Sequence, residues 1–239
     1  MPPATSAETP PDAEMAPPRS AIPPARRGGV VLCGGRSSRM GSSKAWLPLG
    51  GETMLQRVVR RVSEAVEVCV VVAAAGQELP SLPAAVRIAR DNREGRGPLE
   101  GLAAALKAAG ELADAWFVTS CDTPLVEPRL VSRLFELLEE PDVVESPNCP
   151  VRFDAAVPVD GELPQPLSAV YRASILPQVE SQLADDRLRL RDLLQRIQVR
   201  RVAVDELRSV DPTLGSFRNL NTPDEYQRAV VELSRLHGS

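Results

Sequence analysis

Short apolar runs alternate with segments of helical periodicity along most of the chain. Four runs are rich in apolar and β-branched residues and are bounded by glycine, proline or charged residues: 29–33, 66–75, 85–91 and 116–122. Such runs are too short for buried helices and are typical of strands that are covered on both faces. The pattern therefore predicts at least four strands of a parallel sheet.

Three segments between and after these runs carry apolar residues at helical spacing. Thr53 is a good N-cap for a helix whose apolar positions run from Leu55 to Val66. Further helices are predicted at 99–109, after the sequence GRGPLEG, and at 128–139. Strands that alternate with helices predict a doubly wound, mostly parallel, Rossmann-like α/β sheet with helices on both faces.

The first 28 residues differ in composition from the rest of the chain. They contain eight of the 23 prolines and almost no large apolar side chain. Such a segment buries too little surface to offset the entropy lost on ordering. We therefore predict a disordered tail rich in proline and alanine at 1–28 and a single domain at 29–239.

Composition and charge limit the class of partner. The chain has 239 residues, a net charge of −4 and a pI near 5.3, so it offers no basic field for a long nucleic acid. A local group of Arg36, Arg39 and Lys44 suits a small anion such as a nucleotide. No apolar stretch reaches the ~20 residues that span a bilayer, and the chain lacks the order of a secretory signal. We expect a cytoplasmic protein with no membrane partner.

Four cysteines, at positions 33, 69, 121 and 149, form no C-x-x-C pair. Three of them lie in or beside apolar runs, where cysteine packs as a small hydrophobic residue. The spacing disfavours both a zinc site and a disulfide framework.

Polar features follow three of the predicted strands: the Gly34-Gly35 loop, Asp91 and Asp122. In a doubly wound sheet the ligand crevice lies beyond the carboxyl ends of the strands. We therefore expect a loop lined by backbone amides and two carboxylates around one pocket.

The loop after the first strand reads LCGGRSSRMGSSK, from Leu32 to Lys44. It matches neither the P-loop nor the G-x-G-x-x-G fingerprint, and a glycine pair alone is often only a tight turn. Here, however, glycine amides and the cations Arg39 and Lys44 stand together, and they suit a triphosphate and a leaving pyrophosphate. The loop is predicted to hold phosphates.

Asp122 has two interpretations. It follows a fully apolar run and precedes Thr123-Pro124, so it is either a helix cap or a metal ligand. A carboxylate that faces a triphosphate needs a cation between them, and Mg²⁺ is typically held by one or two carboxylates plus substrate phosphates. We favour the metal ligand.

The only histidine, His237, is the third residue from the end, which disfavours any mechanism with an imidazole base. Nucleotidyl transfer to a phosphate monoester needs no such base, because the nucleophile is already an anion. Positioning and charge neutralisation by lysine, arginine, glycine amides and Mg²⁺ are sufficient.

Five motifs in order give the chain a family resemblance: LCGGRSSRMGSSK, Asp91 followed after five residues by GPLEGL, SCDTP, QPLSAVYR and FRNLNTPDEY. From about residue 29 to residue 226 the chain resembles the molybdenum cofactor guanylyltransferases. The resemblance implies a fold like that of the nucleotide-diphospho-sugar transferases. It also implies Mg²⁺-dependent transfer of GMP from GTP to molybdenum-molybdopterin, with release of pyrophosphate and with molybdoenzymes or their chaperones as further partners.

The resemblance also implies roles for individual residues. Leu32, Cys33 and Gly34 would meet the guanine through backbone groups, and Gly35 and Lys44 the phosphates. Asp91 would bind the nucleoside, Asp122 the Mg²⁺, and the turn Gly97-Pro98-Leu99 would border the ribose. The alanines at 73–75 stand where the family often has an asparagine that contacts the base, which bears on purine selectivity.

The second half of the chain offers fewer candidates. Asn219 and Asn221 flank Leu220, an alternation that puts both amides on one face of an extended segment, towards the acceptor in the family. Thr222 and Pro223 are predicted to be a helix cap and the first helical residue. Two alternatives remain open: a nucleotidyltransferase that uses CTP or a sugar-phosphate acceptor, and an inactive homologue that only binds the nucleotide or cofactor.

Overall fold

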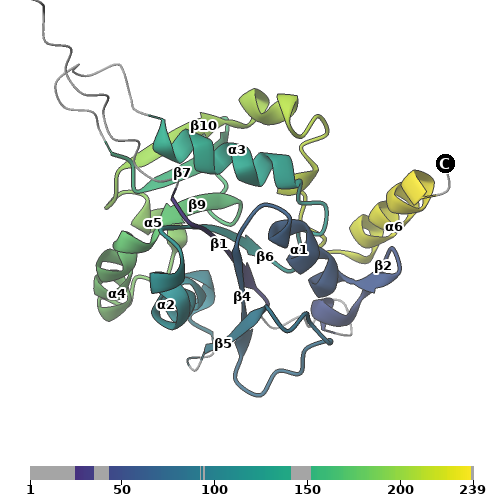
Figure 1. Cartoon of the computed structure of the whole chain (residues 1–239), viewed down its shortest axis with the longest axis horizontal. Helices are drawn as coiled ribbons and strands as arrows, with labels where there is room; N and C mark the ends of the chain where they lie inside the picture. The colour runs from purple at the N-terminus through teal and green to yellow at the C-terminus, as the bar shows by residue number, and fades with distance from the viewer. Residues whose placement is uncertain (1–24, 35–42, 92, 94, 141–151, 238–239) are drawn as a thin grey trace, which may run out of the picture.

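The chain folds around one central sheet. The computed structural model describes residues 25–34, 43–91, 93, 95–140 and 152–237, within which eight strands form this sheet and two form a small hairpin (Figure 1). Along the sheet the order is β10-β7-β9-β6-β1-β4-β5, with β8 paired to β7. The strands of this sheet are β1 (Arg27–Leu32), β4 (Val68–Ala74), β5 (Arg87–Asp91), β6 (Ala115–Ser120), β7 (Ala155–Asp160), β8 (Leu163–Pro164), β9 (Ala169–Arg172) and β10 (Val199–Ala203).

The strands at one end of the sheet, β5, β4, β1 and β6, all run parallel. Strand β9 is inserted antiparallel between β6 and β7, and β10 then pairs parallel with β7. The predicted doubly wound, mostly parallel sheet is confirmed. Because four parallel strands are neighbours, their carboxyl ends lie along one edge of the sheet.

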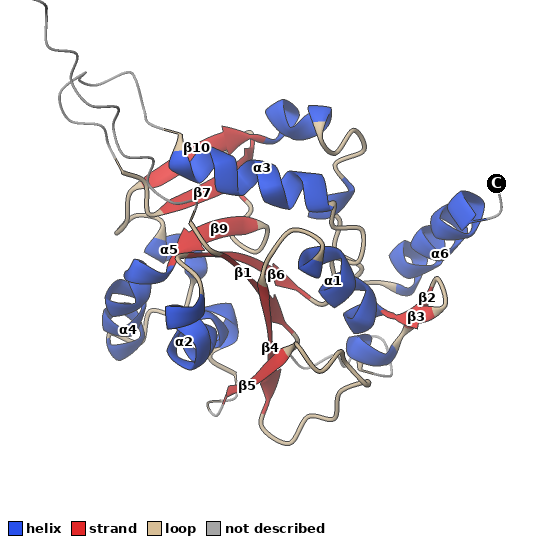
Figure 2. Ribbon diagram, viewed as in Figure 1, coloured by secondary structure: helices blue, strands red, loops and turns tan. Residues whose placement is uncertain are grey.

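Helices cover both faces of the sheet (Figure 2). They are α1 (Met54–Ser63), α2 (Gly97–Ala109), α3 (Pro128–Glu139), α4 (Leu176–Ala184), α5 (Leu190–Leu193) and α6 (Pro223–His237). Side chains alternate along β1, so Val31 packs in a core with α1 and α3, whereas Val30 and Leu32 pack in a second core with α2 and α4. Helix α6 packs against the hairpin of β2 (Pro48–Leu49) and β3 (Glu52–Thr53).

The predicted helices are present with small changes at their ends. Thr53 caps α1 as predicted and forms a capping box with Gln56, but α1 ends at Ser63, so Val66 packs on the core from outside the helix. Helix α2 begins at Gly97, two residues before the predicted start, and Pro98 lies in its first turn, where proline is tolerated. Helix α3 has the predicted bounds.

The folded part of the chain begins before residue 29. The Arg26 amide donates to the Asp114 carboxylate at 2.8 Å, and the Arg26 carbonyl accepts from Asp114 N at 2.9 Å. Arg27 and Gly28 already pair with Ala115 and Trp116 of β6. The last residues assigned to the tail therefore belong to the sheet, and residues 1–24 lie outside the described part.

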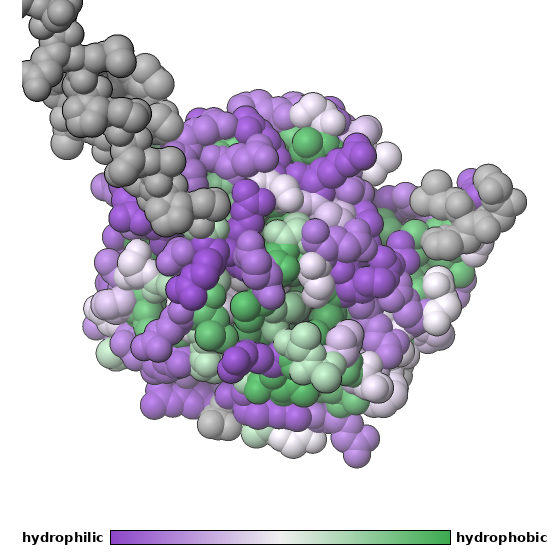
Figure 3. All heavy atoms as spheres, viewed as in Figure 1, coloured by the Kyte–Doolittle hydropathy of each residue, from purple (hydrophilic) through white to green (hydrophobic). Residues whose placement is uncertain are grey.

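Hydrophilic and hydrophobic areas alternate on the part of the surface that Figure 3 shows. On the face in Figure 3, hydrophilic residues cover most of the surface and hydrophobic residues show in smaller areas between them. The large hydrophobic residues exposed among those described lie on separate segments: Trp46, Ile88, Leu163 and Val231. Of the helices described, none is long and apolar enough to cross a membrane.

Gly28 marks a close approach between β1 and the core, which gives a stability prediction. A Cβ atom at Gly28 would lie 2.3 Å from Cε3 of Trp116, a ring that is fully buried. Gly28→Ala should therefore lower the free energy of unfolding by about 1–3 kcal/mol, the usual cost of overpacking, measured by denaturant titration. Gly110→Ala is the matched control, because a Cβ there meets nothing within 4 Å at a helical φ of −59°. Equal stability of both variants would contradict this packing.

Candidate active site

Three polar side chains from distant segments meet beyond the carboxyl end of β6. The Lys44 ammonium donates to Oδ2 of Asp122 at 3.1 Å and to Oδ1 of Asn221 at 2.7 Å. Lys44 opens a short 3₁₀ helix, η1 (Lys44–Trp46), Asp122 follows β6, and Asn221 precedes α6. We call this group the Lys44–Asp122–Asn221 cluster. It brings together three residues that the sequence predicted separately as site residues.

Asp122 makes two further hydrogen bonds in this cluster. Its carbonyl accepts a hydrogen bond from Leu220 N at 2.8 Å, and its Oδ1 accepts one from the Ser120 hydroxyl. The Asp122 side chain is 19% exposed and that of Lys44 is 17% exposed, so the ion pair is shielded but open to a ligand. Helix α3 begins at Pro128 with Glu127 as its N-cap, so the interpretation of Asp122 as the cap of this helix is wrong.

The segment that brings in Asn221 has the predicted alternation. Asn219 and Asn221 are exposed and Leu220 between them is buried, so both amides lie on the accessible side. The Glu225 amide donates to the Thr222 hydroxyl, and Oε2 of Glu225 accepts from the amides of Asn221 and Thr222, which lowers the pKa of that carboxyl. The predicted cap of α6 is confirmed, and the side chain of Asn221 takes no part in it.

The end of β1 lies between the ends of β4 and β6. Cys33 N donates to the Val72 carbonyl at 2.7 Å, and Cys121 N donates to the Leu32 carbonyl at 2.9 Å. Gly34 follows at once and is exposed. The backbone at Leu32, Cys33 and Gly34 is therefore fixed on both sides and ends at the edge where the Lys44–Asp122–Asn221 cluster lies.

Gln77 is a residue that the sequence analysis missed. Its Nε2 donates to the Cys33 carbonyl at 2.9 Å, and its Oε1 accepts from Ala74 N at 3.1 Å, so one side chain ties the end of β1 to the end of β4. Arg90 in turn donates to the Gln77 carbonyl at 2.8 Å. The sequence signal that could have identified Gln77 is an amide side chain three residues after the end of β4. Gln77 positions the backbone of Cys33 and Gly34.

This contact predicts an effect on nucleotide binding. Gln77→Ala should weaken nucleotide binding about five- to tenfold, because the loss of one hydrogen bond is worth about 1 kcal/mol and frees the Cys33 carbonyl. The measurement is nucleotide affinity by calorimetry. Gln56→Ala is the control: it removes the α1 capping box and should lower the melting temperature without changing affinity. Unchanged affinity in Gln77→Ala would refute the positioning role.

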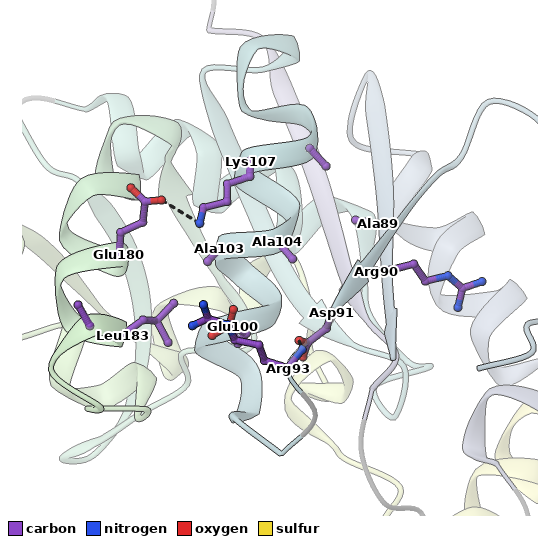
Figure 4. Close-up of a pocket in the computed structure, with 12 residues that line it drawn as sticks. Ala89, Arg90, Asp91, Arg93, Glu100, Ala103, Ala104, Lys107, Glu180 and Leu183 are labelled. Atoms are coloured by element: carbon purple, nitrogen blue, oxygen red, sulfur yellow. Dashed lines mark hydrogen bonds and ion pairs between the residues drawn. The ribbon is translucent and has the colours of Figure 1, made fainter. Parts of the chain in front are cut away.

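Asp91 lies apart from Asp122. It ends β5, the edge strand, and β4 and β1 stand between β5 and β6, so three strand spacings of ~4.8 Å separate the two chain segments. Asp91 borders a cavity of about 600 Å³ between β5, α2 and α4, with an ion pair of Lys107 and Glu180 at 2.8 Å on its far side (Figure 4). Asp91 and Asp122 lie at the same edge of the sheet, about three strand spacings apart. The expectation that both surround one pocket stays a prediction.

The turn at the start of α2 follows Asp91. The side chain of Leu99 is fully buried in the core, so at this residue only backbone is open to a ligand. Gly97 is exposed and takes its left-handed conformation here, which favours glycine. Gly35, Arg36 and Arg39 lie outside the described residues, and their roles stay predictions.

The QPLSAVYR segment is structural at its end. Tyr171 and Arg172 end β9, and both are buried. The Tyr171 hydroxyl donates to the Pro166 carbonyl at 2.9 Å, and burial raises its pKa. Arg172 pairs with Glu139 at 2.8 Å and donates to the Phe153 carbonyl. Both side chains therefore make their polar contacts within the protein.

The site fits a metal ion that takes some of its ligands from the protein and the rest from a bound nucleotide. Within the described residues no group of three or more His, Cys, Asp or Glu side chains forms a self-sufficient metal site. Asp122 Oδ2 and Asn221 Oδ1 are oxygen donors that already converge on one cation, the Lys44 ammonium. Mg²⁺ prefers oxygen ligands and is commonly bound by one or two carboxylates together with substrate phosphates. The chemistry of these donors suits such an ion.

Two thiols lie beside the same edge. Cys33 and Cys121 are both buried. The Cys121 thiol lowers the pKa of Cys33, and the Cys33 thiol together with burial raises the pKa of Cys121. Cys69 lies towards the other end of β4, where burial raises its pKa to about 11. Cys149 lies outside the described residues.

Comparison with known proteins places this chain in a family. Residues 29–202 match the model of the MobA-like NTP transferase domain. The chain belongs to this family. A relative in Pelotomaculum thermopropionicum named "Probable molybdenum cofactor guanylyltransferase" is 33% identical over 203 residues, which cover 85% of this chain and 91% of the relative. The family resemblance found in the motifs is thereby confirmed.

A second relative and a solved structure agree with this family assignment. The molybdenum cofactor guanylyltransferase of Desulfosudis oleivorans is 32% identical over 202 residues, 84% of this chain and 93% of the relative. The crystal structure of molybdopterin-guanine dinucleotide biosynthesis protein A from Archaeoglobus fulgidus has a TM-score of 0.67 and 25% identity, and the match covers 87% of this chain and 99% of that one. The fold expected for this family is confirmed.

Proposed function

We propose that the protein transfers GMP from GTP to the terminal phosphate of molybdenum-molybdopterin, forming the guanine dinucleotide cofactor and releasing pyrophosphate. The observation that carries this proposal is the Lys44–Asp122–Asn221 cluster at the carboxyl edge of the parallel strands. Family membership and the names of the relatives support the choice of guanine and of the acceptor. Molybdoenzymes or their chaperones are the proposed recipients of the product.

The reaction needs positioning and charge neutralisation rather than a base. An oxygen of the acceptor's terminal phosphate attacks the α-phosphorus of GTP, and the bond from that phosphorus to pyrophosphate breaks. Lys44 supplies a positive charge at the phosphates, and the backbone of Cys33 and Gly34 orients the base. Asn221 accepts a hydrogen bond from the Lys44 ammonium, and the family resemblance implies that it lies towards the acceptor.

Asp122 is the proposed ligand of Mg²⁺, with Asn221 as a second oxygen donor beside it. The ion, when bound, supplies positive charge that offsets the charge developing on the phosphate oxygens. Asp122 itself contributes a carboxylate that the Ser120 hydroxyl orients, and its backbone carbonyl accepts from Leu220 N. A protein that only binds the nucleotide would have little use for a metal ligand. The arrangement therefore favours an enzyme over an inactive homologue.

Pyrophosphate release tests the proposal. The full-length protein is incubated with molybdenum-molybdopterin and each of GTP, ATP, CTP and UTP, with Mg²⁺ or with EDTA. We expect release that requires GTP, acceptor and Mg²⁺ together. Release with CTP in preference to GTP would favour the cytidylyl alternative, and binding of GTP without any release would favour the inactive homologue.

A further inference from the structure

Cys33 and Cys121 lie next to each other at the ends of two adjacent strands, β1 and β6. Residues Leu32 of β1 and Ser120 of β6 are the last pair of that register, so the two cysteines form the next pair. The hydrogen bond from Cys121 N to the Leu32 carbonyl, at 2.9 Å, continues the ladder to this point. Both side chains point to the face covered by α1 and α3, where they pack in the same core cluster. Neither sulfur has a part in the proposed transfer.

We propose that Cys33 and Cys121 are a redox site, in which a hydroperoxide converts the two thiols to a disulfide that reversibly inhibits the active site. The pair differs from a structural disulfide framework, since both cysteines are free thiols in the folded chain. Intracellular disulfides, where they occur, are usually transient and catalytic or redox-sensing. The place of these two sulfurs, one residue from Gly34 and one from Asp122, fits a sensing role.

The backbone geometry admits the bond with a small movement. Facing residues on adjacent strands have Cα atoms ~4.8 Å apart, within the roughly 4.4–6.8 Å that disulfides span. The Cβ atoms of a disulfide must come to roughly 3.5–4.5 Å, which is closer than the strand spacing. Both cysteines lie just beyond the last residues of their strands, Leu32 and Ser120, so the strand ends can draw together.

The chemistry balances with a hydroperoxide as the only co-reactant. The sulfur of Cys33 attacks one peroxide oxygen, the O–O bond breaks, and Cys33 becomes a sulfenic acid. The sulfur of Cys121 then attacks the Cys33 sulfur, the S–O bond breaks, and hydroxide leaves and takes up a proton as water. In sum, two thiols and hydrogen peroxide give one disulfide and two waters, so the sulfurs lose two electrons and the peroxide gains two.

The bond would disturb both halves of the site at once. Gly34 follows Cys33, whose carbonyl is held by Gln77, and Asp122 follows Cys121, with its carbonyl held by Leu220 N. Drawing the strand ends together shifts the backbone on both sides of the bound nucleotide. Displacements near 1 Å in an active site cost up to about a hundredfold in rate. We expect the oxidised protein to lose at least about tenfold in turnover.

Oxidation of the full-length protein with hydrogen peroxide tests this proposal. After quenching, free thiols are alkylated and the digest is searched for a peptide that links Cys33 to Cys121. GTP affinity and turnover are measured on the same samples before and after addition of a reducing agent. We expect the linked peptide, weaker GTP binding, at least about tenfold lower turnover, and recovery of all three readouts on reduction.

Variants identify the pair, each being compared with its own reduced form. Cys121→Ser should give no linked peptide. Its turnover should be the same in untreated, peroxide-treated and reduced samples. Cys33→Ser should behave likewise and serves if the first variant folds poorly. Cys69→Ser and Cys149→Ser are matched controls that keep the pair and should respond to peroxide like the unaltered protein.

Two outcomes would overturn the proposal. The first is reversible inhibition of the same size in Cys121→Ser and Cys33→Ser, which would assign the effect to other cysteines. The second is formation of the Cys33–Cys121 link without a change in GTP affinity or turnover, which would make the bond silent. GTP binding by the reduced protein tests the proposed function separately from either outcome.

Discussion

Replacing Asp122 with asparagine should lower turnover about a hundredfold to a thousandfold while the fold survives. Asparagine keeps the size of the side chain and an oxygen that can accept from Lys44, but it removes the negative charge that a Mg²⁺ ligand supplies. GTP affinity should fall far less, because Lys44 and the backbone at Gly34 remain. The measurement is the single-turnover rate across a Mg²⁺ titration, beside GTP affinity and melting temperature.

Asp114→Asn is the matched control for this variant. Asp114 precedes the same strand, β6, at its amino end, and its carboxylate accepts from the Arg26 amide far from the cluster. Its replacement should leave turnover unchanged at every Mg²⁺ concentration. If Asp122→Asn keeps nearly the turnover of the unaltered protein, Asp122 is not the metal ligand. The mechanism would then lose its strongest support from a single residue.

Loss of the Lys44 charge should have an effect of similar size. In Lys44→Met the phosphates lose their positive partner, and the Asp122 carboxylate, only 19% exposed, loses the ammonium 3.1 Å away. We expect the rate to fall by about a hundredfold or more and the KM for GTP to rise, since lysine acts on the ground state and on the transition state. Steady-state kinetics with GTP as the varied substrate separates the two effects.

The chain supplies its own control, because it has only two lysines. The second, Lys107, lies on α2 and pairs with Glu180 at 2.8 Å, and its side chain is 56% exposed. An ion pair as exposed as this contributes little to stability. Lys107→Met should therefore leave kcat and KM unchanged, whereas equal kinetics for both lysine variants would show that Lys44 does not act at the phosphates.

The sequence predicted the layered fold well because the signals for it are local. Helix α3 has the predicted bounds, since Pro128 fixes its start and buried leucines follow at helical spacing. The buried strands β1, β4 and β6 are apolar on both faces, as parallel strands between two helical layers must be. The antiparallel insertion of β9 could not be predicted, because it depends on pairing with β6 and β7 rather than on its own four residues.

The same contrast holds for the site. The types of residue, a lysine after a glycine loop and an aspartate after an apolar strand, were visible in the sequence. The contact of Lys44 with Asn221 was not, because 177 residues separate them and only the folded chain brings them together. The distance between Asp91 and Asp122 likewise depends on strand order, which places β4 and β1 between their strands. The role of Gln77 depends on a turn that returns its amide to the ends of β1 and β4.

The most direct test of guanylyl transfer is the mass of the product. The full-length protein is mixed with molybdenum-molybdopterin, Mg²⁺ and equal concentrations of the four nucleoside triphosphates, and the pterin product is identified by mass spectrometry after one turnover. We expect the guanine dinucleotide form to dominate, with an equal amount of pyrophosphate. A cytosine dinucleotide as the main product, or an unmodified pterin after complete binding of GTP, would contradict the account.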